Sequence, residues 1–156
     1  MNPSQKHTLK TWIAAILWLI VITIESSNLG SAANTSRYLY PLLHFLIGLD
    51  PARFLVWHPY IRKSGHFVGY FTLSWLLFRA WRATLEGSGT LRWSILWAGI
   101  ALTMTALVAS LDEWHQIYLA SRTGTIQDVF LDTFAALTAQ FVIYLALRKR
   151  RPTLVA

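Results

Sequence analysis

The chain has 156 residues, of which 54% are hydrophobic and only 13% are charged. This balance is far from that of soluble domains and argues against a water-soluble globular protein. The net charge of +7 comes from small basic groups beside apolar runs, which favours anionic lipid headgroups over nucleic acid as the partner. The chain has no cysteine, which rules out disulfides and thiolate chemistry.

Four apolar runs predict an all-α fold, a polytopic transmembrane helical bundle in which residues 1–156 form a single domain. The first run, Thr11–Ile24, has only fourteen uncharged residues, so its helix must include flanking residues to cross a membrane. The expected spans are about 9–27, 64–82, 91–111 and 126–147.

A secretory signal is the alternative interpretation of the first run. Lys6 and Lys10 precede it, and Ser31-Ala32-Ala33 resembles a small-residue cleavage site.

The stretch from Ser26 to Arg62 is too long for a simple turn between spans one and two. Its apolar centre, Tyr38–Leu46, is too short to cross a membrane. We therefore expect an interfacial helix or a re-entrant segment there.

The basic residues predict the orientation of the bundle, because they concentrate on the cytoplasmic side of bacterial membrane proteins. Nine lie on the side of the termini: Lys6, Lys10, Arg79, Arg82, Arg92, Arg148, Lys149, Arg150 and Arg151. Five lie on the other side: Arg37, Arg53, Arg62, Lys63 and Arg122. We therefore expect a protein of the bacterial inner (cytoplasmic) membrane with both termini in the cytoplasm. Every acid except Glu86 then lies at the outer side.

Polar residues recur along one face of the expected second span. Lys63, His66, Tyr70 and Ser74 follow three- and four-residue steps, so a polar stripe descends from the outer surface. Gly65 and Gly69 on the same helix form a small-xxx-small pair, for which we favour helix packing.

Acidic residues mark the outer ends of the third and fourth spans. Asp112 and Gln116 share a helix face, with Glu113 beside them. Asp128 and Asp132 follow one turn apart, and Asp132 lies well inside the apolar run. An ionised carboxylate at that depth costs several kcal/mol unless it faces a polar cavity or a cation, so Asp132 is a functional candidate.

The connectivity allows the outer ends of spans two, three and four to form one pocket. It would contain Lys63, His66, Glu113, Gln116, Arg122, Asp128 and Asp132. A buried ion-pair network that only holds the bundle in register is the alternative interpretation. A divalent cation such as Mg²⁺ on Glu113, Asp128 and Asp132 is a further option, because clustered carboxylates suit hard cations.

This ordered set of residues resembles the VanZ-like family of bacterial membrane proteins. The family pattern is a Lys/His/Tyr helix, a DE-x-x-Q segment, then an Arg and an Asp, matched here by Lys63, His66, Tyr70, Asp112, Glu113, Gln116, Arg122 and Asp128. The chain departs from the pattern at Asp132 and Ala135, where the family has Asn and Gly. The resemblance implies an effect on the cell envelope linked to glycopeptide resistance, notably to teicoplanin.

A second resemblance is to the motifs of type 2 phosphatidic acid phosphatases. Ser64-Gly65-His66 and Ser121-Arg122 are similar to parts of those motifs, with Asp132 at the position of the terminal Asp. Asp128 stands where the nucleophilic histidine would be, so an aspartyl nucleophile or a metal-activated water would be needed.

These observations favour a pocket that binds an anionic lipid or a lipid-linked cell-wall precursor, with Arg122 and Lys63 on its phosphate or carboxylate. Tyr70, Gln116 and Asp112 would complete this binding site.

The alternative is a lipid phosphate hydrolase or transferase. His66 would be the general acid and Asp128 the nucleophile or base, supported by Glu113 and Asp132. A non-catalytic scaffold is the third hypothesis, and proton-coupled transport is disfavoured because the acids do not continue toward the cytoplasmic half.

Overall fold

The structure is a computed structural model that describes residues 1–85 and 92–148, and within that part of the chain all regular secondary structure is helical, with no strand. The elements are α1 (Pro3–Ser26), the short 3-10 helix η1 (Asn28–Gly30), α2 (Ala32–Ile47), α3 (Pro51–Leu85), α4 (Ile95–Gln116) and α5 (Ile126–Leu147). The predicted all-α class is confirmed. Glu86, the Gly87-Ser88-Gly89 connection, Leu91 and the basic group Lys149, Arg150 and Arg151 lie outside the described residues.

Three helices, α1, α4 and α5, are each long and apolar enough to cross a membrane. The consecutive helices α2 and α3 pass the same test only as a pair, and they meet at a bend of 117°. A bend of this size is found in a broken span or a re-entrant loop, so the pair adds a fourth crossing if it counts as one span.

Local sequence fixes this bend between α2 and α3. Gly48 ends α2 with a φ of 65°, a left-handed conformation that glycine adopts without strain. Asp50 Oδ1 accepts a hydrogen bond from the backbone N–H of Ala52 at 2.8 Å, and Pro51 occupies the first turn of the new helix. Because of this start, α3 begins well before the predicted second span at residue 64.

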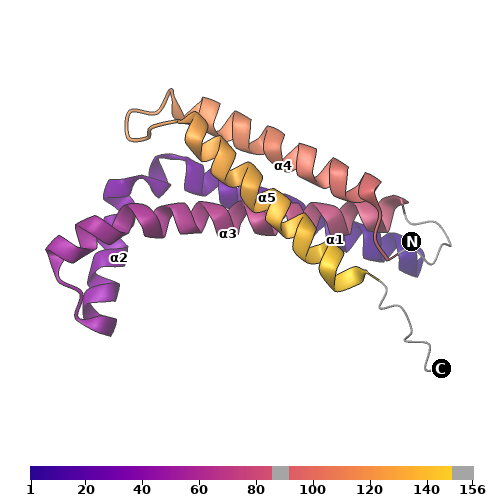
Figure 1. Ribbon diagram of the computed structural model, residues 1–156, viewed down its shortest axis with the longest axis horizontal. Helices are drawn as coiled ribbons and strands as arrows, with labels where there is room; N and C mark the ends of the chain where they lie inside the picture. Colours follow the sequence, from indigo (N-terminus) through magenta and orange to yellow (C-terminus); the bar gives the residue numbers. More distant parts are fainter. Residues whose placement is uncertain (86–91, 149–156) are drawn as a thin grey trace, which may run out of the picture.

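The long helix α3 lies at the centre of the bundle and packs against α1, α4 and α5 (Figure 1). Alanines on α5 and α4 are fully buried and let the helix backbones approach: Ala135, Ala136, Ala139, Ala101 and Ala109. Large apolar side chains such as Leu17, Phe130 and Phe134 point outward instead. This arrangement suits a bundle whose solvent is lipid.

The predicted packing role of the glycine pair on α3 is wrong. A Cβ added at Gly65 or Gly69 would meet no atom within 4 Å, so neither position is a close helix contact. The backbone carbonyl oxygen of Gly69 accepts a hydrogen bond from the Trp18 indole at 2.8 Å. This bond joins α1 to α3.

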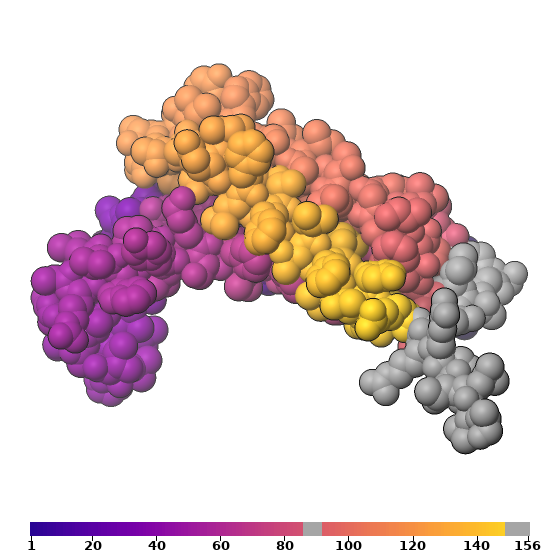
Figure 2. Space-filling model, in the orientation of Figure 1, coloured from indigo at the N-terminus to yellow at the C-terminus, as the bar shows by residue number. Residues whose placement is uncertain are grey.

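The start of α1 and the end of α5 lie at the same end of the bundle (Figure 1). The α4–α5 connection and the α2–α3 bend lie at the opposite end. There, α2 and the first part of α3 project beyond the bundle (Figure 2), and they expose apolar side chains such as Phe45, Leu46 and Trp57. We call this opposite end the loop end.

Candidate functional site

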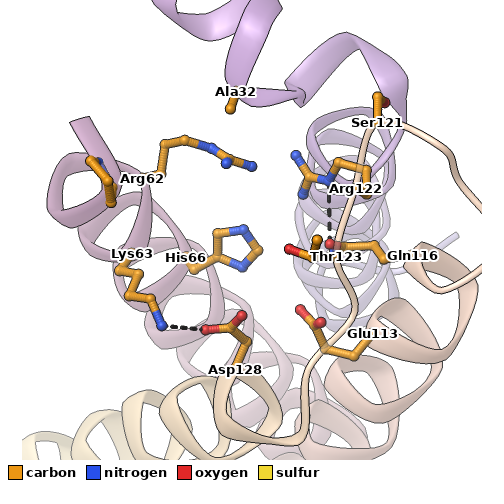
Figure 3. Close-up of a pocket in the computed structure, with 11 residues that line it drawn as sticks. Ala32, Arg62, Lys63, His66, Glu113, Gln116, Ser121, Arg122, Thr123 and Asp128 are labelled. Atoms are coloured by element: carbon orange, nitrogen blue, oxygen red, sulfur yellow. Dashed lines mark hydrogen bonds and ion pairs between the residues drawn. The ribbon is translucent and has the colours of Figure 1, made fainter. Parts of the chain in front are cut away.

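A polar pocket of about 280 Å³ lies at the loop end, between α2, α3, the end of α4 and the first turn of α5 (Figure 3). Three cationic side chains, two acids and one histidine line it: Arg62, Lys63, Arg122, Glu113, Asp128 and His66. Residues from four parts of the sequence therefore meet at one site.

Two guanidinium groups, Arg62 and Arg122, face one another across this pocket (Figure 3). Arg122 is only 8% exposed, its Nε donates to Gln116 Oε1 at 3.2 Å, and its Nη2 is buried without a hydrogen-bond partner. Within the described residues, neither arginine pairs with a carboxylate. A buried cation without a counterion needs an explanation, and an anionic ligand would supply one.

Both guanidinium groups donate to a single backbone oxygen, the carbonyl of Gly30. Arg62 Nη2 lies 3.3 Å from it, and Arg122 Nη1 makes a shorter contact. Gly30 is required here because a Cβ would come within 1.8 Å of the Glu25 carbonyl oxygen. The tight turn after α1 thus orients both arginines.

Lys63 and Asp128 form an ion pair at the edge of the pocket. Lys63 Nζ lies 2.8 Å from Asp128 Oδ1, and the Thr125 hydroxyl donates to Asp128 Oδ2 at 2.9 Å. Thr125 caps α5, whose first turn also favours an acid through the helix dipole. The Lys63 side chain is 56% exposed, so this pair contributes at most about 1 kcal/mol to stability.

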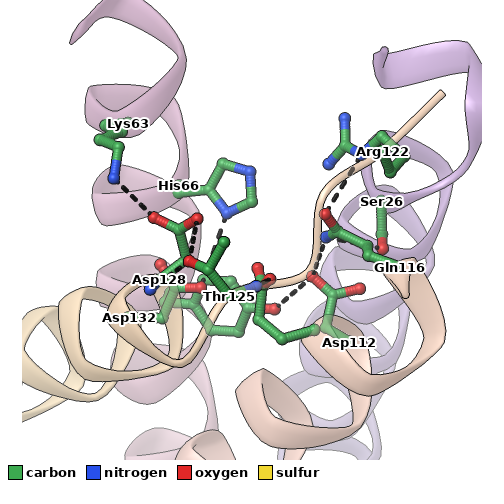
Figure 4. Close-up of polar contacts among 11 residues, drawn as sticks. Ser26, Lys63, His66, Asp112, Gln116, Arg122, Thr125, Asp128 and Asp132 are labelled. Atoms are coloured by element: carbon green, nitrogen blue, oxygen red, sulfur yellow. Dashed lines mark hydrogen bonds and ion pairs between the residues drawn. The ribbon is translucent and has the colours of Figure 1, made fainter. Parts of the chain in front are cut away.

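A second polar group lies below the arginines and links three helices (Figure 4). Tyr70 on α3 donates its hydroxyl to Asp112 Oδ2 at 2.8 Å. The Gln116 amide donates to the same oxygen at 3.2 Å and to the Ser26 hydroxyl at 3.2 Å. Asp112 Oδ2 and the Gln116 amide therefore join α1, α3 and α4.

The third group contains His66, Glu113 and Asp132. Asp132 is completely buried, and its Oδ2 lies 3.5 Å from His66 Nδ1. Glu113 is 4% exposed, and its Oε2 accepts a hydrogen bond from the Thr125 backbone N–H at 2.8 Å. A backbone hydrogen bond thus holds Glu113, whereas Asp132 has no such bond.

A histidine above the pocket secures α2 against α3. His58 lies in the part of α3 before residue 64, where the predicted span begins, and its Nε2 is 3.0 Å from the Thr35 hydroxyl. This contact holds α2 against the part of α3 that carries Arg62, one turn further along the helix.

The structure places all nine predicted site residues at the loop end. Six of them line the pocket (Lys63, His66, Glu113, Gln116, Arg122 and Asp128), whereas Tyr70, Asp112 and Asp132 lie below it. Two residues of the site, Arg62 and Gly30, are not among those predicted from the sequence. Arg62 lies one turn before His66 on the same helix, and this spacing could have identified it.

The metal ligands expected from sequence were Glu113, Asp128 and Asp132. In the structure the side chains that could share a metal ion are His66, Glu113 and Asp132. Asp128 is not one of them, because Lys63 and Thr125 hold its carboxylate.

Comparison with known proteins identifies the family of the chain. The family model described as VanZ/LLP1 matches residues 11–148, which is most of the chain and includes every residue of the pocket. None of the curated proteins and none of the solved structures compared with the chain matches it. The apolar helices and the extent of the family match together make the chain a helical membrane protein that belongs to the VanZ/LLP1 family.

Proposed function

We propose that this protein binds the anionic headgroup of a membrane lipid or a lipid-linked cell-wall precursor in the pocket at the loop end. One observation carries the proposal: Arg62 and Arg122 converge on the pocket without any carboxylate partner among the described residues, and Arg122 Nη2 is buried and unsatisfied. Paired guanidinium groups match the geometry of a phosphate or carboxylate, which accepts two parallel hydrogen bonds from each fork.

The surroundings of the pocket favour a lipid over a free anion. Helix α5 carries exposed apolar side chains next to the pocket, among them Ile126, Phe130 and Phe134. An acyl or isoprenoid chain could lie along this apolar surface while its headgroup reaches the arginines. Lys63, which is half exposed, would contact the headgroup from the rim.

The orientation follows from the charge distribution. With α2 and α3 as one broken span, the bundle has four crossings, and the basic residues at the ends of the chain lie in the cytoplasm. The pocket then opens at the outer face of a bacterial cytoplasmic membrane, where cell-wall intermediates and glycopeptide antibiotics are found. An effect on teicoplanin susceptibility would follow from binding such an intermediate.

Binding of a defined lipid to purified protein tests the proposal. Short-chain phosphatidic acid, in detergent that contains a chelator, is expected to bind, whereas phosphatidylcholine is not. Arg122→Ala should weaken phosphatidic acid binding roughly 30-fold or more, because loss of a buried charge contact costs about 2 kcal/mol or more.

The matched control is Arg53→Ala, which removes an arginine that pairs with Asp50 at 3.5 Å on the exposed surface. This variant should bind like the wild type. Equal phosphatidic acid affinity of wild type and Arg122→Ala, with both proteins helical and monodisperse, would overturn the proposal. A scaffold function predicts that result.

A second candidate function is hydrolysis of a phosphate ester on such a lipid. It is favoured by the placement of His66, whose Nδ1 faces Asp132 while the ring reaches the pocket. Because Lys63 and Thr125 hold the Asp128 carboxylate, His66 takes the role of the base in this reaction and accepts a proton from water as the water oxygen bonds to phosphorus. The ester P–O bond then breaks, and His66, now the general acid, returns the proton to the oxygen of the departing alcohol.

Phosphate release measures this second function. Wild type should release phosphate from phosphatidic acid or an isoprenoid phosphate, and His66→Gln should lower the rate by about 100-fold or more. No release from either lipid, with or without added divalent metal, would eliminate the enzyme and leave the binding proposal intact.

A further inference from the structure

Three side chains from three helices converge below the pocket. His66 on α3, Glu113 on α4 and Asp132 on α5 each offer one ligand atom, and these atoms lie within 4.8 Å of one another. Ligands of one metal ion at bond lengths of about 2.1 Å are separated by roughly 3 to 3.5 Å. The most widely separated of these atoms therefore need to draw together by at most about 1.3 to 1.8 Å.

Asp132 is the second, independent observation. The residue is 0% exposed, and neither Oδ1 nor Oδ2 has a hydrogen-bond partner. His66 Nδ1, its neighbour at 3.5 Å, is also buried without a hydrogen bond. Buried polar groups are almost always satisfied, so three unsatisfied atoms at one point indicate a missing partner.

The neighbouring polar groups are already committed elsewhere. Lys63 binds Asp128, and Tyr70 and Gln116 both donate to Asp112. Arg122 donates to the Gln116 side chain and to the Gly30 carbonyl. Among the described residues, His66 is the only side chain within ion-pair distance of Asp132.

The charge and orientation of the group suit a divalent cation. With a neutral imidazole, two carboxylates supply a charge of −2, which a divalent ion balances. Glu113 Oε2 is fixed by the Thr125 N–H, the kind of supporting hydrogen bond that orients a metal ligand. The second oxygen of Glu113 remains free to coordinate.

We propose that His66, Glu113 and Asp132 bind a divalent transition metal ion such as Zn²⁺ or Mn²⁺. An imidazole ligand favours these ions over Mg²⁺ or Ca²⁺, which prefer oxygen ligands alone. Three protein ligands leave at least one coordination position open, and His66 and Glu113 also line the pocket above. The metal site stands on its own and does not require that the pocket binds a lipid.

Metal analysis of purified protein tests this inference. After chelator treatment and reloading with Zn²⁺ or Mn²⁺, the wild type should retain about one ion per chain, measured by inductively coupled plasma mass spectrometry. Asp132→Asn should weaken metal binding by roughly 100-fold or more. Even substitution of residues that only support a metal ligand lowers metal affinity by about 10- to 100-fold, and Asp132 would be a ligand itself. Mn²⁺ bound to the protein should also show a changed electron paramagnetic resonance spectrum.

Asp50→Asn is the matched control, because it removes an exposed carboxylate that lies outside both the pocket and the metal group. It should bind the metal like the wild type. Glu113→Gln is a second variant in case Asp132→Asn does not fold, and it should also lose the ion. Wild-type protein that retains neither Zn²⁺ nor Mn²⁺, or variants that retain it equally, would overturn the inference and leave a protonated His66 as the partner of Asp132.

Discussion

Two buried polar residues of α5 differ in how far their side chains are hydrogen-bonded. The amide nitrogen of Gln140 donates to the Ser74 carbonyl at 3.1 Å and to the Ser74 hydroxyl at 2.8 Å, whereas Gln140 Oε1 is buried without a hydrogen-bond partner. Asp132 lies two turns earlier at the loop end, and neither of its carboxylate oxygens has a hydrogen bond. Both side chains are buried between α5 and α3.

This difference distinguishes a polar residue that packs two helices together, Gln140, from one that we assign to a binding site, Asp132. A polar residue that joins two helices in lipid finds a partner within the protein, as the Gln140 amide nitrogen does at Ser74. A buried carboxylate that has no hydrogen bond, and whose neighbour is one histidine at 3.5 Å, destabilises the fold, so it persists for a reason other than packing. Stability and binding should therefore respond differently at the two positions.

The largest expected effect on stability is at Asp132. In the presence of a chelator, Asp132→Asn should raise the free energy of unfolding by about 3 kcal/mol, because it removes a buried charge that has no hydrogen bond. Thermal unfolding followed by circular dichroism measures this. Added Zn²⁺ or Mn²⁺ should stabilise the wild type and leave the variant unchanged. A variant less stable than chelated wild type would show that Asp132 is already satisfied by His66.

A smaller effect is expected at the turn that supports the pocket. Gly30→Ala should destabilise the protein by about 2 kcal/mol, because the new Cβ would overlap the Glu25 carbonyl oxygen. The Gly30 carbonyl would move, so phosphatidic acid affinity should fall as well. Gly65→Ala is the control, since a Cβ there meets no atom within 4 Å. Equal stability of the two alanine variants would contradict the close contact.

At the middle of α5 the effect should be smaller still. Gln140→Leu should lower stability by about 1 kcal/mol, the usual contribution of a hydrogen bond between membrane helices. Ligand and metal binding should stay at wild-type values, because Gln140 lies outside the pocket and the metal group. Loss of metal binding in this variant would show that the two regions are coupled.

The smallest effect on stability is expected at the exposed ion pair. Lys63→Met should change the free energy of unfolding by about 0.5 kcal/mol or less, since more than half of the lysine side chain is exposed. Denaturant unfolding at low and high salt measures this. A change above about 2 kcal/mol would mean that the pair is shielded from solvent.

The sequence by itself determined the helical class and the end of the bundle at which the polar residues gather. The apolar runs are long enough to form helices in lipid, and α5 occupies the residues expected for the fourth span. The three- and four-residue spacing from Lys63 to Ser74 places these polar side chains on one face of the helix, whatever the position of that helix in the bundle. Asp132 stood out because an acid deep in an apolar run is costly in any arrangement.

Which of those polar residues pair with one another was decided only by the tertiary structure. Sequence could not show that Lys63 pairs with Asp128, that Tyr70 takes Asp112, or that His66 is left facing Asp132. These pairings depend on the rotation and depth of three helices relative to one another, which hydrophobic periodicity does not fix. The Gly30 turn, which brings Arg62 and Arg122 together, likewise arises from contacts between residues about 30 and 90 positions apart in the chain.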